Sequence, residues 1–325
     1  MRAIDPPRPE EIARARERIA GIALRTPLLP FDLPDAPARI HLKLECLQPI
    51  GSFKIRGAAN AMRLADPRAL ERGVTTASAG NMAQGVAWVA RALGIPCTAI
   101  VPDRAPRAKL DAIERLGARV VKVPFETWWR VIEEHRYEGM EGLFIHPVSD
   151  PAVIAGNGTI GLEILEELPD TEAILVPYGG GGLLSGIAIA AIAVKPAMRV
   201  YACEVDTAAP LTASIREGTP QTIERHASFV DGIGGSSVLP EMWPMVRGLV
   251  EGTIVVTLEE IASAIRLLVE RARVVAEGAG GASLAAALRG EAEGSKVVCI
   301  VSGGNIDSAK LAAILSGEVP ASTMT

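Results

Sequence analysis

One lysine stands in a setting suited to nucleophilic chemistry. Lys54 follows Gly51-Ser52-Phe53 and is followed by Ile55-Arg56-Gly57. Strand-forming residues 40–44 precede this stretch and a helix-compatible run, 58–64, follows it, so the lysine is predicted at a strand-to-helix turn. A lysine in a pocket can have a lowered pKa and form a Schiff base with a carbonyl cofactor. The alternative is an ordinary surface lysine, and the other motifs bear on that choice.

A run of four glycines indicates a phosphate site. It follows a predicted strand, 174–178, precedes a predicted helix, 183–194, and consists of Gly179, Gly180, Gly181 and Gly182. Without side chains the backbone can approach a phosphate and direct N–H groups at it, and the dipole of the following helix adds to the attraction. No Gly-Lys-Ser/Thr follows, and Leu184 replaces the third glycine of a dinucleotide loop. The run is therefore neither a Walker loop nor a Rossmann fingerprint.

Another strand-to-helix turn is a candidate substrate site, formed by Ser78, Ala79, Gly80 and Asn81. Backbone N–H groups at the start of a helix bind anions, such as a substrate carboxylate. The alternative is ordinary N-capping by Ser78 or Asn81.

Two further residues lie at predicted element ends. Ser302 ends the last apolar strand, at the edge where α/β proteins bind ligands, although a tight turn is the alternative. Glu277 opens a helix as a candidate cofactor contact or a plain capping acid. A lysine for a carbonyl, a glycine cradle for a phosphate and a neutral hydroxyl for a ring nitrogen together describe pyridoxal phosphate.

The elements that must position these residues alternate between short apolar strands and helices. This rhythm predicts an α/β fold of two parallel sheets covered by helices, with the cofactor in the cleft between them. We expect residues 1–72 and 150–325 to form a large cofactor-binding domain and residues 73–149 a small mobile one. The predicted helices are 9–22, 58–64, 82–93, 105–116, 128–138, 154–168, 183–194, 258–271 and 280–289, and the predicted strands are 40–45, 74–78, 97–101, 119–123, 143–145, 173–178, 200–204, 252–256 and 296–302.

Composition narrows the class of protein. The chain has 325 residues, 49% of them hydrophobic and 22% charged, with a net charge of −5, which indicates a soluble globular protein and gives no support to nucleic-acid binding. No apolar run is long enough to span a bilayer. The four cysteines are far apart and the four histidines lack metal-ligand spacing, which favours reduced thiols in a cytoplasm.

The motifs resemble those of fold type II pyridoxal-phosphate enzymes of the threonine/serine dehydratase and serine racemase family. The resemblance runs from Pro27 to Asp307 in the family's order and spacing. It rests on four stretches, which are 43–58 around the lysine, 78–81, 179–186 and 302–305.

The resemblance implies a role for each candidate residue. Lys54 would hold the cofactor as an imine and then act as the base at the substrate Cα. The four glycines would bind the phosphate, and Ser78 to Asn81 the substrate carboxylate. The remaining cofactor contacts would be Asn81 at the phenolic oxygen, Ser302 at the pyridine nitrogen, Phe53 beside the ring, Gly232 on its other side, and Glu277.

The implied activity is deamination of an L-β-hydroxy amino acid, such as threonine, serine or a bulkier analogue, to a 2-oxo acid and ammonia. Racemisation or β-replacement on the same cofactor is the alternative, and a binding protein without catalysis is a third. The family also suggests a homodimer. The chain ends soon after the last motif, so we expect no separate regulatory domain.

Several positions depart from the family pattern. Ala79 replaces the serine that racemases carry before Gly-Asn, which favours elimination. Racemases bind a divalent cation through a glutamate and an aspartate six residues later. Glu204 is present, but Pro210 takes the place of the aspartate, so we expect the cation site to be altered or lost, with Asp206 as the alternative ligand. Val148 replaces a bulky aromatic residue; this predicts a larger substrate pocket, unless Trp128 and Trp129 repack around it.

Overall fold

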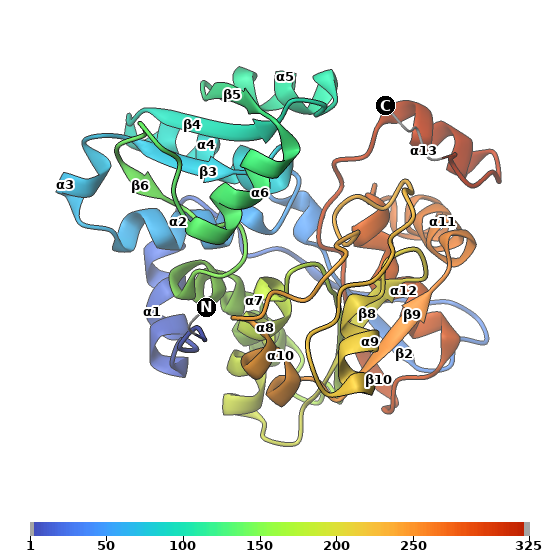
Figure 1. The fold of residues 1–325 in the computed structure, drawn as a ribbon. Helices are drawn as coiled ribbons and strands as arrows, with labels where there is room; N and C mark the ends of the chain where they lie inside the picture. Colours follow the sequence, from blue (N-terminus) through green and yellow to red (C-terminus); the bar gives the residue numbers. More distant parts are fainter. Residues whose placement is uncertain (1–2, 322–325) are drawn as a thin grey trace.

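The computed structural model describes residues 3–321 and contains two β-sheets, each covered by helices (Figure 1). The larger sheet has six strands in the order β1-β2-β10-β7-β8-β9. The smaller sheet has four strands in the order β5-β4-β3-β6. The predicted α/β fold with two helix-covered sheets is therefore confirmed.

The smaller sheet is parallel throughout and lies at the top of Figure 1. Its strands are β3 (Val74–Ala77), β4 (Cys97–Pro102), β5 (Arg119–Val123) and β6 (Leu143–Phe144), and the helices between them are α4 (Asn81–Leu93), α5 (Arg107–Arg115) and α6 (Phe125–Glu134). Alternate residues of β4 enter different cores. Ala99 and Val101 pack with residues of α4 and α5, whereas Ile100 packs with residues of α6. This sheet lies within the predicted small domain, whose boundaries and mobility stay predictions.

The central strands of the larger sheet are buried on both faces. Its strands are β1 (Leu28–Phe31), β2 (Arg39–Lys43), β7 (Ala173–Pro177), β8 (Arg199–Val205), β9 (Gly252–Val256) and β10 (Lys296–Ile300). In β10, Val297 and Cys299 pack with the core of α11 (Leu258–Leu267) and α12 (Gly278–Arg289). Val298 and Ile300 pack on the opposite side, with α7 (Pro151–Glu167), α8 (Gly182–Val194) and α10 (Trp243–Leu249). Burial on both faces explains why these strands read as continuous apolar runs.

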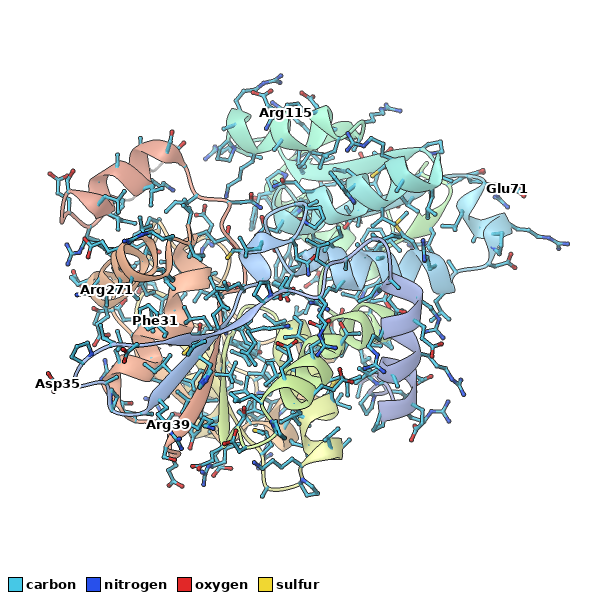
Figure 2. All side chains as sticks on the ribbon, turned by 180° about the vertical axis from the view of Figure 1, so that it is seen from behind. Phe31, Asp35, Arg39, Glu71, Arg115 and Arg271 are labelled. Atoms are coloured by element: carbon cyan, nitrogen blue, oxygen red, sulfur yellow. The ribbon has the colours of Figure 1, made fainter. Side chains whose placement is uncertain are left out.

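One strand departs from the predicted parallel arrangement. β1 pairs antiparallel with β2 at the edge of the larger sheet. Only a short turn joins the two strands, with Asp35 in the left-handed conformation (φ 63°). A parallel pair would need a crossover of roughly a dozen residues, so the short link requires a hairpin. Figure 2 shows this hairpin from behind, with Asp35 at its turn and Arg39 at the start of β2.

The remaining helices are mostly short. The first of them begins as predicted, and the last follows the final strand. The remaining helical elements are α1 (Pro9–Ile19), the 3₁₀ turn η1 (Glu45–Leu47), α2 (Lys54–Leu64), α3 (Pro67–Leu70), α9 (Pro210–Glu217), the π-helical segment η2 (Leu268–Ala272) and α13 (Ser308–Leu315). Among residues 3–321, no helix has the length and apolar character needed to cross a bilayer.

A buried ion network ties the start of α2 to the larger sheet. The Arg56 guanidinium is fully buried and donates to Glu45 Oε2 at 2.8 Å and to Glu163 Oε1 at 2.6 Å. Lys43 Nζ lies 2.7 Å from Glu163 Oε2. Buried charges require such partners, since an unpaired charge in a core is strongly destabilising. The network joins β2, η1 and α7 to the helix that begins with Lys54, and therefore fixes where that lysine lies.

Candidate active site

A cavity of about 550 Å³ lies between the smaller and the larger sheet with their helices. Its walls come from α2, α4, α5 and α6, from the glycine turn before α8, and from the segment 225–239. Every residue predicted to hold the cofactor or the substrate carboxylate lines this one cavity. These residues are Phe53, Lys54, Ser78, Ala79, Gly80, Asn81, Gly179, Gly180, Gly181, Gly182, Gly232, Glu277 and Ser302.

Lys54 is the first residue of α2, so its amine enters the cavity from a fixed helix end. Nζ donates a hydrogen bond to Pro147 O at 2.7 Å and lies 5.2 Å from the centre of the Phe53 ring. Burial lowers the pKa of this amine to about 8, and the Glu277 carboxylate partly offsets the effect. About a tenth of the amine is therefore in the neutral, nucleophilic form at pH 7.

The glycine turn has space for nothing larger than glycine. Gly181 has φ +96°, and Gly182 is the first residue of α8. A Cβ on Gly180 would lie 2.6 Å from Val148 Cγ1, and one on Gly179 would lie 2.9 Å from Gly232 O. The bare backbone thus faces the cavity at a helix N-terminus, which is the arrangement that binds phosphate.

Asn81 joins the two sides of the cavity through its side-chain amide. Asn81 Nδ2 donates to Glu277 Oε1 at 2.8 Å, and Asn81 Oδ1 accepts from Asn305 Nδ2 at 2.8 Å. The N-cap position of α4 is Gly80, and Ser78 Oγ accepts from the backbone N–H of Gly80 at 3.2 Å. The alternative of an N-cap by Ser78 or Asn81 is therefore wrong, because Ser78 bonds within the loop before α4 and Asn81 reaches across the cavity.

Glu277 lies at the N-cap position of α12, but its side chain does not cap that helix. Its carboxylate accepts a hydrogen bond from the side-chain amide of Asn81 instead. Burial raises the pKa of this carboxyl to about 7, and the hydrogen bond from Asn81 opposes the shift. Ser302 follows β10 and is 3% exposed; its carbonyl accepts from Phe53 N at 3.1 Å. That bond aligns the Lys54 turn with the end of the central strand.

The residues present fit pyridoxal phosphate. A reactive amine, a glycine cradle at a helix N-terminus and a neutral serine line the same cavity. These are the groups that an aldehyde, a phosphate and a pyridine nitrogen require.

The residues do not fit the divalent-cation site that the family resemblance implied. Glu204 is fully buried, and its carboxylate accepts from Leu211 N at 2.8 Å, Thr212 N at 2.7 Å and Thr212 Oγ1 at 2.6 Å. It therefore faces the first turn of α9, which Pro210 begins. In the described part of the chain no three His, Cys, Asp or Glu side chains form a metal-ligand set, and this includes Glu204 with Asp206.

Some contributors to the cavity have no role assigned from the sequence. Asn305 belongs to the turn after β10, and its amide holds Asn81 and Ile50 O. Lys109 on α5 forms an ion pair with Asp231 of the opposite wall, with Nζ 2.7 Å from Oδ2. In the sequence, the only indication of a role for Asn305 is its position three residues after Ser302. The contact between Lys109 and Asp231 joins residues 122 positions apart, and no local pattern in the sequence indicates it.

The comparisons with known proteins agree with this geometry. The family described as "Pyridoxal-phosphate dependent enzyme" matches residues 19–303. The L-threonine ammonia-lyase of Thermotoga maritima is 40% identical over 304 residues, which cover 92% of this chain and 75% of that protein. The structure of maize serine racemase superposes with a TM-score of 0.87 at 34% identity, covering 96% of this chain and 98% of the other. The crystal structure of a T.th. threonine deaminase gives a TM-score of 0.82 at 34% identity, covering 93% of this chain and 99% of the other.

Fold and cavity define an α/β enzyme whose cavity contains the groups that suit a carbonyl cofactor. The chain belongs to the pyridoxal-phosphate-dependent enzyme family, and within it to the fold type II enzymes. The resemblance predicted from the sequence is confirmed.

Proposed function

We propose that the protein is an ammonia-lyase that converts an L-β-hydroxy amino acid, such as threonine, serine or a bulkier analogue, to a 2-oxo acid and ammonia. The observation that carries the proposal is the amine of Lys54, which has a pKa of about 8 and shares one cavity with the glycine cradle and the start of α4. Relatives named for threonine ammonia-lyase and threonine deaminase activity support the reaction type.

The cofactor contacts follow from positions around the cavity. Gly179 to Gly182 would hold the phosphate with backbone N–H groups. Ser302 would face the pyridine nitrogen and Asn81 the phenolic oxygen, while Phe53, Gly232 and Glu277 would enclose the ring. Pyridoxal phosphate, when bound, supplies the electron sink for the carbanion that forms at Cα.

The substrate roles fall to two elements. The N-terminus of α4, with Ser78, Ala79 and Gly80 before it, would bind the substrate carboxylate through backbone N–H groups. Lys54 Nζ would take the Cα proton, and the β-hydroxyl would then leave as water. Addition of water to the released enamine product gives the 2-oxo acid and ammonia, so the net reaction is a deamination.

Elimination is favoured over racemisation by one residue. Ala79 lines the cavity where racemases of the family carry a serine hydroxyl, so the second face of the substrate lacks that acid/base group. Chiral analysis of products from L-serine should show pyruvate in large excess over D-serine. Comparable amounts of D-serine would make racemisation the better assignment.

A panel of L-β-hydroxy amino acids, assayed for ammonia and 2-oxo acid, tests the activity directly. Lys54→Ala should lower turnover by about 10³-fold or more, because it removes both the cofactor attachment and the base. A new amino acid as product would indicate β-replacement. Cofactor binding without turnover of any member of the panel would indicate a binding protein.

We also propose that the protein is a cytoplasmic homodimer. The four cysteines, Cys46, Cys97, Cys203 and Cys299, are buried free thiols, which suits a reducing compartment. Light scattering after size-exclusion chromatography measures the mass, and a monomer of 34.1 kDa would contradict the dimer.

A further inference from the structure

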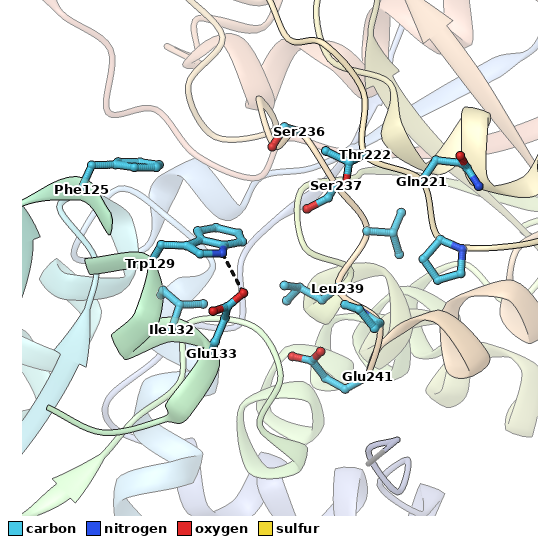
Figure 3. Close-up of a pocket in the computed structure, with 13 residues that line it drawn as sticks. Phe125, Trp129, Ile132, Glu133, Gln221, Thr222, Ser236, Ser237, Leu239 and Glu241 are labelled. Atoms are coloured by element: carbon cyan, nitrogen blue, oxygen red, sulfur yellow. Dashed lines mark hydrogen bonds between the residues drawn. The ribbon is translucent and has the colours of Figure 1, made fainter. Parts of the chain in front are cut away.

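A second cavity, of about 450 Å³, is drawn in Figure 3 and shares part of its wall with the cofactor cavity. We call it the outer pocket; it lies between α6 and the segment 220–241. The two cavities have six wall residues in common, which are Phe125, Trp129, Ile132, Ser236, Ser237 and Leu239. The two cavities are therefore adjacent, and a chain that extends from Lys54 past these residues would reach the outer pocket.

The outer pocket combines an apolar middle with an acidic end. Trp129, Ile132 and Leu239 form apolar walls, and the carboxylates of Glu133 and Glu241 lie beyond them (Figure 3). Trp129 Nε1 donates to Glu133 Oε1 at 2.9 Å, which orients that carboxylate within the pocket.

Glu241 is unusual among the residues of the outer pocket because its carboxylate is buried without a full set of partners. The residue is only 6% exposed, and Oε2 has no hydrogen-bond partner within the described part of the chain. A buried carboxylate oxygen without a partner is unfavourable, and a bound donor or cation removes that cost. The lining has two carboxylates and, among the described residues, no Lys, Arg or His to neutralise them. The pocket is therefore suited to a cation with several N–H donors.

We propose that the outer pocket binds the ammonium or guanidinium end of an aliphatic side chain whose amino-acid end occupies the cofactor cavity. The inference deepens the proposed function, on which it rests, by naming amine-bearing β-hydroxy amino acids as a substrate class. Val148, which lines the cofactor cavity beside the glycine turn, stands where the family pattern has a bulky aromatic residue, and this substitution favours a longer substrate side chain.

Competition experiments with the cofactor-loaded enzyme test the proposal. L-Lysine and L-norleucine have side chains of equal carbon number and lack the β-hydroxyl, so both can act only as inhibitors of ammonia release from serine or threonine. L-Lysine should inhibit at about tenfold lower concentration, because its ammonium ion forms charged hydrogen bonds with the two glutamates. High salt should reduce this preference.

Glu241→Gln should bring the ratio of the two inhibition constants close to one. Glu133→Gln, at an exposed position that is safer for folding, should lower the ratio as well. Glu134→Gln is the matched control, because Glu134 is the next residue of α6 and pairs with Arg136 outside the pocket; it should keep the preference. Equal or tighter inhibition by L-norleucine in the unaltered enzyme overturns the proposal.

Two further measurements follow. One distinguishes a substrate side chain from a separate amine in the outer pocket, and the other tests the pocket independently of the proposed function. Butan-1-amine has the amine and the four-carbon chain of the lysine side chain without the amino-acid end; if it inhibits as well as L-lysine does, the pocket holds a separate amine and not a substrate side chain, and the proposal fails. If no hydroxy amino acid yields ammonia, calorimetry of L-lysine and L-norleucine binding still tests the pocket. Tighter binding of L-lysine then supports it, and equal binding overturns it.

Discussion

Lys54 illustrates how burial alone prepares a residue for chemistry. The low-dielectric cavity disfavours its ammonium form and brings the pKa to about 8, although Glu277 acts in the opposite direction. A lysine in water, with a pKa of about 10.4, would be almost fully protonated at neutral pH. The shift is therefore a property of the cavity and not of the local sequence around the lysine.

This pKa predicts how cofactor-free protein takes up pyridoxal phosphate. Only the neutral amine attacks the aldehyde, so the attachment rate should fall about tenfold per pH unit below pH 8 and level off above it. Stopped-flow absorbance of the bound cofactor measures the rate, and Lys54→Ala, which should give no bound band, is the control. A rate that does not change between pH 6 and pH 9 would contradict the assigned pKa.

Glu277 should reduce the stability of the cofactor-free protein at neutral and higher pH. Burial raises its folded-state pKa from 4.5 to about 7, so the folded carboxyl keeps a proton that the unfolded chain has lost. The contribution of this group to stability is then greatest below pH 4.5 and is lost as the pH rises through 7. Glu277→Gln should have little effect at pH 4.5 and stabilise by up to about 3 kcal/mol at pH 8.

Urea unfolding of the cofactor-free protein at both pH values measures this difference. Glu251→Gln, at an exposed position, is the matched control for removing one acid. A stabilisation by Glu277→Gln that is equal at the two pH values would contradict the predicted linkage.

Residue type and spacing predicted which side chains meet at the cavity but not how they are bonded. Lys54, the four glycines and Ser302 each stand at an element end, where α/β topology brings functional groups together. The hydrogen bond between Asn81 and Glu277 joins residues 196 positions apart, and no local pattern encodes such a contact. The roles of these side chains toward the cofactor stay predictions until they are tested.

At the scale of elements, the central strands and long helices follow from their apolar pattern, while several helix ends do not. The helix predicted at 128–138 begins at Phe125 and ends at Glu134, because Pro124 stands at its N-cap and His135 takes the left-handed conformation. α10 and α13 were not predicted, since α10 begins with Trp243-Pro244 after a loop-rich region and α13 has one buried residue, Ile314. Weak amphipathic patterns of this length leave little signal.

The first turn of α9 supplies the hydrogen-bond donors that the Glu204 carboxylate would otherwise need from a bound cation. The buried Glu204 carboxylate accepts three hydrogen bonds from the first turn of α9, and its charge also interacts favourably with the helix dipole. We predict that Glu204→Ala destabilises the protein by about 2–4 kcal/mol, because it removes several charged hydrogen bonds and leaves a cavity. Denaturant unfolding measures this change.

The same measurement distinguishes the helix from a cation. Addition of Mg²⁺ or of a chelator should leave the unfolding midpoint and the activity unchanged, because both carboxylate oxygens already have donors. A midpoint that rises with Mg²⁺ in the unaltered protein and not in Glu204→Ala would show that a cation binds there after all.

For the whole molecule, the two sheets have separate cores, and the cofactor cavity lies between them. One core joins α2 to the smaller sheet and its helices, so the helix that begins with Lys54 belongs to both sides. Across the opposite wall, an ion pair links Lys109 of α5 to Asp231. Relative movement of the two parts would therefore open the cavity on the side of this ion pair and pivot near α2.

The Lys109–Asp231 ion pair should weakly stabilise the closed form of the protein, in which the two walls of the cavity are held together. Its side chains are 38% and 51% exposed, and exposed pairs contribute about 0.2–1 kcal/mol, so Lys109→Met should reduce the closed fraction by no more than about fivefold. Hydrogen exchange in α5 and α6 should rise and KM should increase with little change in kcat, because substrate would then have to close the cavity.

Arg107→Met is the matched control, since Arg107 pairs with Asp111 and Glu114 of its own helix. High salt should reproduce the effect of Lys109→Met in the unaltered enzyme and add little in the variant; an equal response of both to salt would show that the ion pair does not control closure.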